Sequence, residues 1–442
     1  MPGGFPLGSP GEVASGSSGG ACPGSPGGVP PDSPGGVPSG SPGGGPAEFP
    51  GGVHVTGSPP VAAPWPPTGG DRPHVVELRL SAFAGHRGAV IPLGPLTLVR
   101  GPSGSGKSSA LRAYEALARL GAGAELSEVF DDPVACVPER ARADTQRRRG
   151  FRIGCSVDGP AGTVRLDLAV QAEPELRVVG ERLTRDGLVL LETALRDPER
   201  PVVQAAWHTA GTAPVTRAPM PDDRLGTALV PLRVAGSTEG QRLVLAAAEQ
   251  VVVALRSAFA CDPRPARMRA PVPAGRVGSG RLLGGCDNLA EVLWRTRAEC
   301  AVRHAALVSA VRDGFAGPVA DVVAEEAEDG AVAAYVDRGD GVRTPLARLG
   351  DGELRYLALA LVLLTGPGVL AVDPAAEVPQ ACQTLTVLAD GLDHRLDARQ
   401  FRALGELAAR TCARGHIRLV GAVGDGVTAG RVTDASVVDL EP

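Results

Sequence analysis

The fold is decided by residues 96 to 120, which read LTLVRGPSGSGKSSALRAYEALARL. A short apolar run ends at Gly101, a stretch rich in glycine and serine follows, and apolar residues then recur at helical spacing from Leu111 to Leu120. The order of these patterns predicts a buried strand, a glycine-rich loop and an α-helix in direct succession.

The loop between the predicted strand and helix matches the pattern G-x-x-x-x-G-K-[ST] in full. Its glycines let backbone N–H groups point into one concavity, to which the start of the helix adds its positive dipole end. In such a loop Lys107 reaches the β- and γ-phosphates of a nucleotide, and the Ser108 hydroxyl binds Mg²⁺. We therefore predict ATP and Mg²⁺ as ligands. The predicted binding residues are Gly101, Pro102, Ser103, Gly104, Ser105, Gly106, Lys107, Ser108 and Ser109.

Lys107 is the only lysine among the 44 basic residues of the chain. Arginine serves as the basic residue everywhere else. A lysine ammonium is a compact point charge that a planar guanidinium does not replace. The use of lysine at this one position suggests that the chemistry of the loop requires it.

The composition of the chain changes near residue 73. Residues 1–72 are dominated by Gly, Pro and Ser, with SPGG recurring at 25, 33 and 41, and predict a disordered tail. Residues 73–442 predict a folded body.

The net charge of −5 gives no global basic field, and the eight cysteines form no C-x-x-C pair, so we expect no metal site built from them. With no signal-peptide pattern and no apolar run of about 20 residues, we expect a cytoplasmic protein.

The remaining elements are predicted from periodicity. Apolar strands alternate with helices, which indicates an α/β fold with a mostly parallel sheet covered on both faces. The predicted elements are an edge strand at 75–80, a strand-rich region at 150–235, a buried helix at 240–262, a charged amphipathic arm at 288–325, a buried helix at 354–364, and central strands at 369–372 and 417–423.

Two later segments resemble motifs of a known family. LGDGELR, residues 349 to 355, is similar to the signature motif L-S-x-G-x-x-R of ABC-type ATPases. VLAVD, ending at Asp373, resembles the Walker B strand, whose aspartate holds Mg²⁺. Residues 75 to 109 are similar to the opening of the SMC/RecF/OLD-like group. The resemblance covers about residues 74 to 130 and 340 to 440, and it implies an ATPase head at 73–442 with residues 150–340 as an inserted strand-rich lobe and helical arm.

The resemblance also implies an ATP-dependent homodimer. Each glycine-rich loop would face the partner's signature segment across the bound nucleotide. The signature residues are Leu349, Gly350, Asp351, Gly352, Glu353 and Arg355. In the family, dimer closure on ATP moves the arms, so this chain is expected to act as a switch.

Groups that the family uses for hydrolysis are missing from the matched positions. Pro374 stands where a glutamate follows the Walker B aspartate, Gly350 replaces the signature serine, and LVGAVGDG lacks the expected histidine. Glu377 is the candidate substitute base. Because loss of a general base costs about 10²–10⁴ in rate, we predict tight ATP binding with slow or absent hydrolysis.

Two other functions stay open. One is an active ATPase linked to DNA repair or defence, for which two groups of arginines could contact nucleic acid, at 140, 142 and 147–149 and at 264, 267, 269, 276 and 281. Turnover stimulated by nucleic acid would favour it. The other, a transporter subunit, is opposed by the 242 residues that separate Lys107 from Leu349, because transporter subunits have a shorter interval.

Overall fold

The glycine-rich loop follows the fourth strand of a five-stranded parallel sheet. The computed structural model describes residues 72–210, 214–276, 278, 280–426, 432 and 434–441. The strand order is β10 (Ala258–Cys261), β14 (Leu385–Ala389), β15 (Ile417–Gly424), β3 (Leu96–Gly101) and β16 (Ser436–Asp439). All four neighbouring pairs are parallel. The predicted strands at 96–100 and 417–423 are thus confirmed, as is the parallel sheet.

The predicted central strand at 369–372 is wrong. Leu370 makes only an isolated bridge with Leu282. The position in the sheet is taken by β14, whose five residues are all buried. The apolar run at 369–372 is short and lies between Gly368 and Pro374, and proline cannot donate to a strand ladder.

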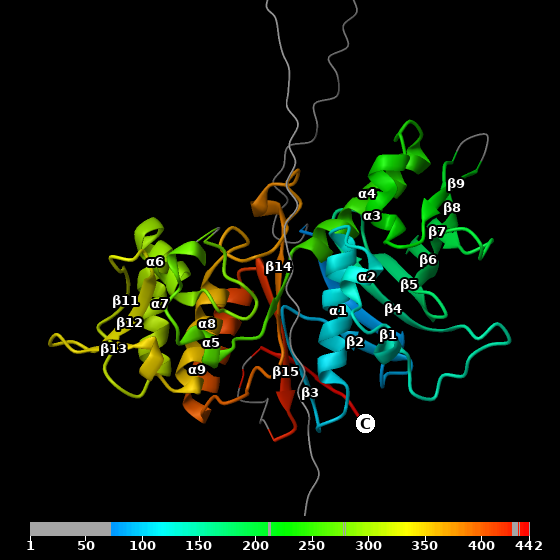
Figure 1. Cartoon of the computed structure of the whole chain (residues 1–442). Helices are drawn as coiled ribbons and strands as arrows, with labels where there is room; N and C mark the ends of the chain where they lie inside the picture. Colours follow the sequence, from blue (N-terminus) through cyan, green and yellow to red (C-terminus); the bar gives the residue numbers. More distant parts are fainter. Residues whose placement is uncertain are drawn as a thin grey trace, which may run out of the picture. The chain divides into compact units, whose positions relative to one another are not determined.

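A second sheet of eight antiparallel strands lies on one side of the helix that follows the loop (Figure 1). Its order is β2 (Ala89–Pro92), β1 (His74–Ala82), β4 (Arg149–Asp158), β5 (Val164–Glu173), β6 (Arg177–Arg185), β7 (Leu188–Ala194), β8 (Val202–His208) and β9 (Val215–Pro221). The predicted strand-rich region is confirmed. β1 is wrongly predicted as an edge strand, because it lies between β2 and β4.

Two helices fill the space between the two sheets. α1 (Lys107–Gly121) and α4 (Glu239–Arg256) share one hydrophobic cluster with the inner face of the antiparallel sheet and with Leu388, Val420 and Ala422 of the parallel sheet. This arrangement fixes the direction of α1 and so the position of the loop before it. Shorter elements on this side are α2 (Leu126–Val129), η1 (Val134–Cys136) and α3 (Gly226–Arg233).

The other face of the parallel sheet is covered by a second hydrophobic cluster. Its helices are α5 (Pro265–Met268), α6 (Leu289–Glu299), α7 (Ala301–Gly314), α8 (Asp351–Leu364) and α9 (Ala398–Cys412), with the short turns η2 (Ala274–Arg276), η3 (Leu346–Arg348) and η4 (Gln380–Cys382). A three-stranded antiparallel sheet of β11 (Asp321–Glu326), β12 (Val332–Asp337) and β13 (Arg343–Pro345) completes this side.

The helical pattern predicted at 288–325 is confirmed over α6 and α7, but residues 321–325 belong to β11. The helix is interrupted at Cys300, and α6 and α7 bury their apolar sides in the second cluster. The Tyr356 hydroxyl of α8 donates to the Ala310 carbonyl of α7 at 2.7 Å. β10, a strand of the parallel sheet, lies inside the range 150–340 that we predicted as an insertion.

The predicted tail at 1–72 lies outside the described residues, apart from Arg72. The seven cysteines that the structure describes are free thiols. Within the described ranges, no helix is long and apolar enough to cross a membrane.

Candidate functional site

The glycine-rich loop makes a tight turn between β3 and α1. Gly104 and Gly106 both adopt φ of +89°, which side chains rarely tolerate. A Cβ at Gly101 would lie 2.5 Å from the Leu440 carbonyl oxygen, so only glycine fits there. Lys107 Nζ donates to the carbonyls of Gly101 at 2.7 Å and Pro102 at 2.8 Å. The ammonium is therefore held across the loop that the sequence predicted as the phosphate site.

The start of α1 is open to an anion. Gly106 is its N-cap and supplies no side-chain cap, and the first turn contains no acidic residue. The first N–H groups of a helix have no acceptor within the helix, and the helix dipole favours negative charge there. Ser108 is exposed, and its hydroxyl has no partner among the described side chains. The structure thus brings together the residues that we predicted to bind phosphate.

The other loop residues differ in exposure. Pro102, Ser103 and Gly104 are exposed, whereas Ser105 is buried and its hydroxyl has no hydrogen-bond partner within the described structure. Ser109 lies on the first turn of α1, where its hydroxyl accepts a long 3.4 Å hydrogen bond from Arg112. These positions leave the mouth of the loop accessible from solvent.

Asp373 does not lie near the loop, so its prediction as a Mg²⁺ ligand is wrong. Its carboxylate pairs with Arg256 at 2.9 Å, and its side chain is 71% exposed. Arg256 ends α4 just before β10 starts, which puts the pair at the amino end of the parallel strands. Lys107 lies at their carboxyl end. Asp373 also lines a cavity with Ala122, beyond the far end of α1, about 20 Å of helix from Lys107.

Glu377 does not lie near the loop either. It is exposed in the turn before β14, at the same amino edge of the sheet. Gln383 fixes this turn, because its Nε2 donates to the carbonyls of Ala375 at 2.8 Å and Val378 at 2.7 Å. The suggestion that Glu377 serves as a substitute base is therefore not supported by its position.

Asp390 directly follows β14, which is separated from β3 in the sheet by the single strand β15. Ala389, the last residue of β14, pairs with Gly421 of β15, which pairs with Leu98 of β3. Asp390 therefore leaves the sheet at the carboxyl end, beside the loop, where ligands of open parallel sheets bind. Its carboxylate has no hydrogen-bond or ion-pair partner within the described residues. The missed sequence signal is the run LTVLA, which ends at an aspartate as VLAVD does.

The turn after Asp390 stays close to the start of the loop. Asp393 Oδ2 accepts from the Gly424 N–H at 3.1 Å, and Gly424 pairs with Gly101. Gly391, which directly follows Asp390, has φ of +57° and no side chain to act as a base. The hydrolytic glutamate is thus absent from this position too.

The donor set at this edge fits Mg²⁺. Ser108 and Asp390 offer a hydroxyl and a carboxylate, and hard cations prefer oxygen ligands. Mg²⁺ commonly uses one or two protein oxygens together with phosphates and water. The described residues contain no cluster of three or more His, Cys, Asp or Glu side chains that could hold a metal.

The predicted signature segment forms the start of α8, which differs in charge from the start of α1. Glu353 accepts from the Gly350 N–H at 3.0 Å and so caps the helix with its own carboxylate. Asp351 pairs with Arg269 at 2.7 Å and with Arg395. The Arg269 hydrogen bond, with the nearby Arg395, lowers the pKa of Asp351. The carboxylates of Asp351 and Glu353 therefore lie where the resemblance expects a phosphate.

Other signature residues are buried. Arg355 is 4% exposed, and it donates to the carbonyl of Pro263 at 2.8 Å and of Gly391 at 2.9 Å. Leu349 is 3% exposed, and Gly352 lies against the Arg395 carbonyl, 2.4 Å from where its Cβ would be. Arg355 therefore supports the Asp390–Gly391 turn of its own chain and is not accessible to a partner.

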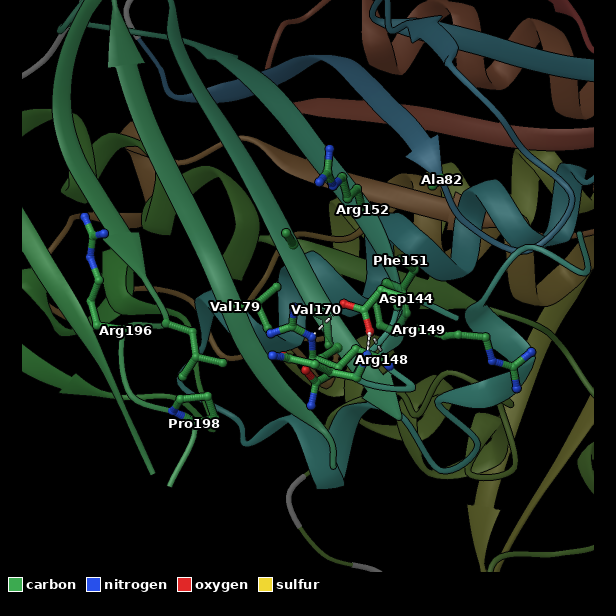
Figure 2. A pocket seen from close by; sticks show the side chains of 15 residues that line it. Ala82, Asp144, Arg148, Arg149, Phe151, Arg152, Val170, Val179, Arg196 and Pro198 are labelled. Atoms are coloured by element: carbon green, nitrogen blue, oxygen red, sulfur yellow. Dashed lines mark hydrogen bonds and ion pairs between the residues drawn. The ribbon is translucent and has the colours of Figure 1, made fainter. Parts of the chain in front are cut away.

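A separate pocket lined by arginines lies on the outer side of the antiparallel sheet (Figure 2). Its volume is about 730 Å³. Arg148 pairs with Asp144 at 2.8 Å, and Arg149 pairs with Glu173. The two remaining arginines of the pocket, Arg152 and Arg196, are exposed and have no ion-pair partner in the described structure. With Glu173 included, four arginines against two carboxylates leave the pocket with a net charge of +2.

Comparisons with known proteins find solved structures of low similarity. No protein-family model matches the chain, and no curated protein matches it. An SMC head bound to the C-winged-helix domain of ScpA aligns with a TM-score of 0.46 and 12% identity over 83% of this chain and 95% of that chain. An SMC head domain from Thermotoga maritima gives 0.39 and 12%, over 83% and 94%. A Pyrococcus furiosus Smc head domain with an extended coiled coil, bound to the C-terminal domain of ScpA, gives 0.44 and 11%, over 84% and 94%.

Proposed function

We propose that this chain is an ATP-binding protein of the ABC-type, SMC/RecF-like group that acts as an ATP-dependent switch with slow hydrolysis. The observation that carries the proposal is the start of α1, where a glycine-rich turn, an uncapped helix end and Lys107 converge. No carboxylate of the first turn competes with a phosphate there. Ser108 and Asp390 would hold Mg²⁺, which neutralises charge on the β- and γ-phosphates when bound.

Slow turnover follows from the residue that succeeds Asp390. A glutamate there would orient the attacking water, and Gly391 has no side chain for that role. We therefore still propose slow hydrolysis, but we attribute the missing base to Gly391 and no longer to Pro374. Binding and release of ATP, rather than chemistry, would then set the state of the switch.

The switch is proposed to work as a homodimer. Near the start of α8, Arg269, Arg338 and Arg395 outweigh Asp351 and Glu353, so the group carries a charge of +1. An ATP phosphate from a partner's loop would meet this mixed group rather than a serine hydroxyl. Dimerisation is expected to depend on ATP and to weaken as salt screens these charges.

The first prediction tests the reassigned aspartate. Asp390→Asn is expected to lower ATP affinity by about 10–100-fold when Mg²⁺ is present, the usual cost of losing a group that orients the metal shell, and to leave affinity in EDTA unchanged. Asp373→Asn is the matched control and is expected to bind as the wild type does. Calorimetric titrations of both variants measure this. Equal losses in both, or a loss only in Asp373→Asn, would contradict the placement of the metal site.

An active ATPase linked to nucleic acid is the second candidate function. The arginine-lined pocket favours it, because Arg152 and Arg196 offer guanidinium groups that have no ion pair with any carboxylate of the described residues. Guanidinium groups bind phosphates in a bidentate manner. Ala82, which lines the pocket, precedes the Phe83–His86 turn that contacts the loop, so a ligand in the pocket would lie close to the nucleotide site.

A second prediction tests this pocket. The double variant Arg152→Ala/Arg196→Ala is expected to weaken binding of single-stranded DNA about tenfold and to reduce the slope of log K against log salt by about 1.4, for two lost phosphate contacts. Arg399→Ala/Arg402→Ala on α9 removes the same charge elsewhere. Fluorescence anisotropy across a salt series measures both. Equal weakening by the α9 variant would assign the effect to net charge and not to the pocket.

A further inference from the structure

A histidine outside every predicted motif contacts the glycine-rich loop. His86 Nε2 donates to the Gly106 carbonyl oxygen at 2.9 Å. The ring lies directly over Gly106, because a Cβ built there would be 2.4 Å from Nε2 and 2.6 Å from Cε1. His86 is only 7% exposed. A carbonyl can only accept, so the ring must carry its proton on Nε2.

The turn that holds His86 is fixed on several sides. Phe83 and His86 exchange two backbone hydrogen bonds, at 3.1 and 2.8 Å. The Ala84 N–H donates to the Cys136 carbonyl at 2.8 Å, and Ala84 adopts φ of +48°. The Phe83 ring packs edge-on against Phe151, with ring centroids 5.5 Å apart. The imidazole therefore comes from a rigid support that does not belong to the loop.

The hydrogen bond sets the direction of one peptide plane. In a trans peptide the carbonyl and the following N–H point in opposite directions. The Gly106 carbonyl points toward His86 and the Ala110 N–H, which donates at 2.9 Å. The Lys107 N–H must then point the other way, toward the mouth of the loop. A glycine with positive φ has few barriers against a flip of its peptide plane. The hydrogen bond from His86, in addition to the one from Ala110, therefore stabilises one orientation of this peptide.

We propose that His86 is a positioning residue for nucleotide binding, which fixes the Gly106–Lys107 peptide so that its N–H faces a phosphate. The inference rests on the proposed function and adds a residue to it from the β1–β2 turn. His86 acts through the peptide and not as a proton acceptor, because its Nε2 proton is committed to the Gly106 carbonyl. This contact raises the affinity for the nucleotide, because the loop is already in its binding conformation before the nucleotide arrives.

Three variants of the full chain test the proposal. His86→Leu removes the hydrogen bond and is expected to weaken Mg-ATP binding by about two- to twelve-fold, the net worth of one hydrogen bond. His86→Gln keeps an N–H donor on a side chain of similar reach and is expected to restore binding to within about twofold of the wild type. His208→Leu removes a histidine on β8, away from the loop, and is expected to bind normally.

Hydrogen exchange without nucleotide gives a second readout. The peptide covering residues 104–111 is expected to exchange faster in His86→Leu and at the wild-type rate in His86→Gln. Unchanged exchange and binding in His86→Leu would overturn the proposal. Equal defects in folded Leu and Gln variants would overturn it too, since ring packing would then be the cause. If the wild-type chain binds no ATP, the proposed function fails, and the exchange data alone still decide whether His86 positions the loop.

Discussion

Lys107→Ala abolishes nucleotide binding, with affinity for Mg-ATP expected to fall by about 100-fold or more. The ammonium bridges two loop carbonyls in this structure, and a nucleotide would add β- and γ-phosphate oxygens within its reach. Hydrogen bonds to charged groups contribute about 1.5–3 kcal/mol each, so the loss of two such contacts accounts for this factor. The fold should persist, because the hydrogen bonds of the ammonium are to two carbonyls of the loop itself.

Lys107→Arg is the informative companion variant. A guanidinium keeps the charge but is planar and larger, so we expect it to recover little of the lost affinity. Titration calorimetry of the wild type and both variants, with circular dichroism to establish folding, makes the measurement. Wild-type affinity in a folded Lys107→Ala protein would remove the basis for the nucleotide site.

Gly391→Glu is expected to raise the steady-state rate of ATP hydrolysis by about 10²–10⁴-fold, the usual contribution of a general base. The new carboxylate would follow Asp390 at the carboxyl edge of the sheet. The ABC-type ATPases that this chain resembles have a glutamate directly after the corresponding aspartate. Strain is expected because Gly391 has φ of +57°, and a side chain there costs about 1 kcal/mol or more.

Gly391→Gln provides the matched control, because glutamine has the same shape and the same backbone strain but no base. The rate of phosphate release is compared between the two variants at saturating Mg-ATP. A folded Gly391→Glu protein that is no faster than Gly391→Gln would show that the missing base does not explain slow hydrolysis. A fast wild-type enzyme would do the same.

The strand, loop and first helix could be predicted residue by residue because their signals are local. Apolar spacing, two glycines and one lysine define the elements before and after the loop, and the structure places them within a residue or two of the prediction. β15 is placed equally well, and α8 ends at the predicted residue but begins three residues earlier than predicted.

The aspartate beside the loop could not be predicted in this way. VLAVD at 369–373 and LTVLAD at 385–390 are similar local patterns, and only tertiary packing decides which run enters the sheet. The resemblance favoured the run that came first after the signature-like segment. Pro374 and Gly368 argued against a strand there, since both weaken one. Periodicity likewise could not distinguish an exposed arm from the packed helices α6 and α7.

Residues that act from a distance were also missed. His86 follows an ordinary strand and has no motif, and its role appears only when the β1–β2 turn is placed against Gly106. Arg355 matched the signature pattern, yet burial assigns it to the support of its own chain. Sequence pattern identifies residue types, whereas accessibility depends on the whole fold.

The central claim, that the glycine-rich loop binds ATP, is tested most directly by the reactivity of Lys107. Because the chain has a single lysine, an amine-acylating reagent followed by peptide mass spectrometry reports on this one side chain. At about 100 times the dissociation constant, Mg-ATP should slow acylation of Lys107 by about 100-fold, and adenosine, which has no phosphates, should not. Equal acylation with and without Mg-ATP would contradict the account.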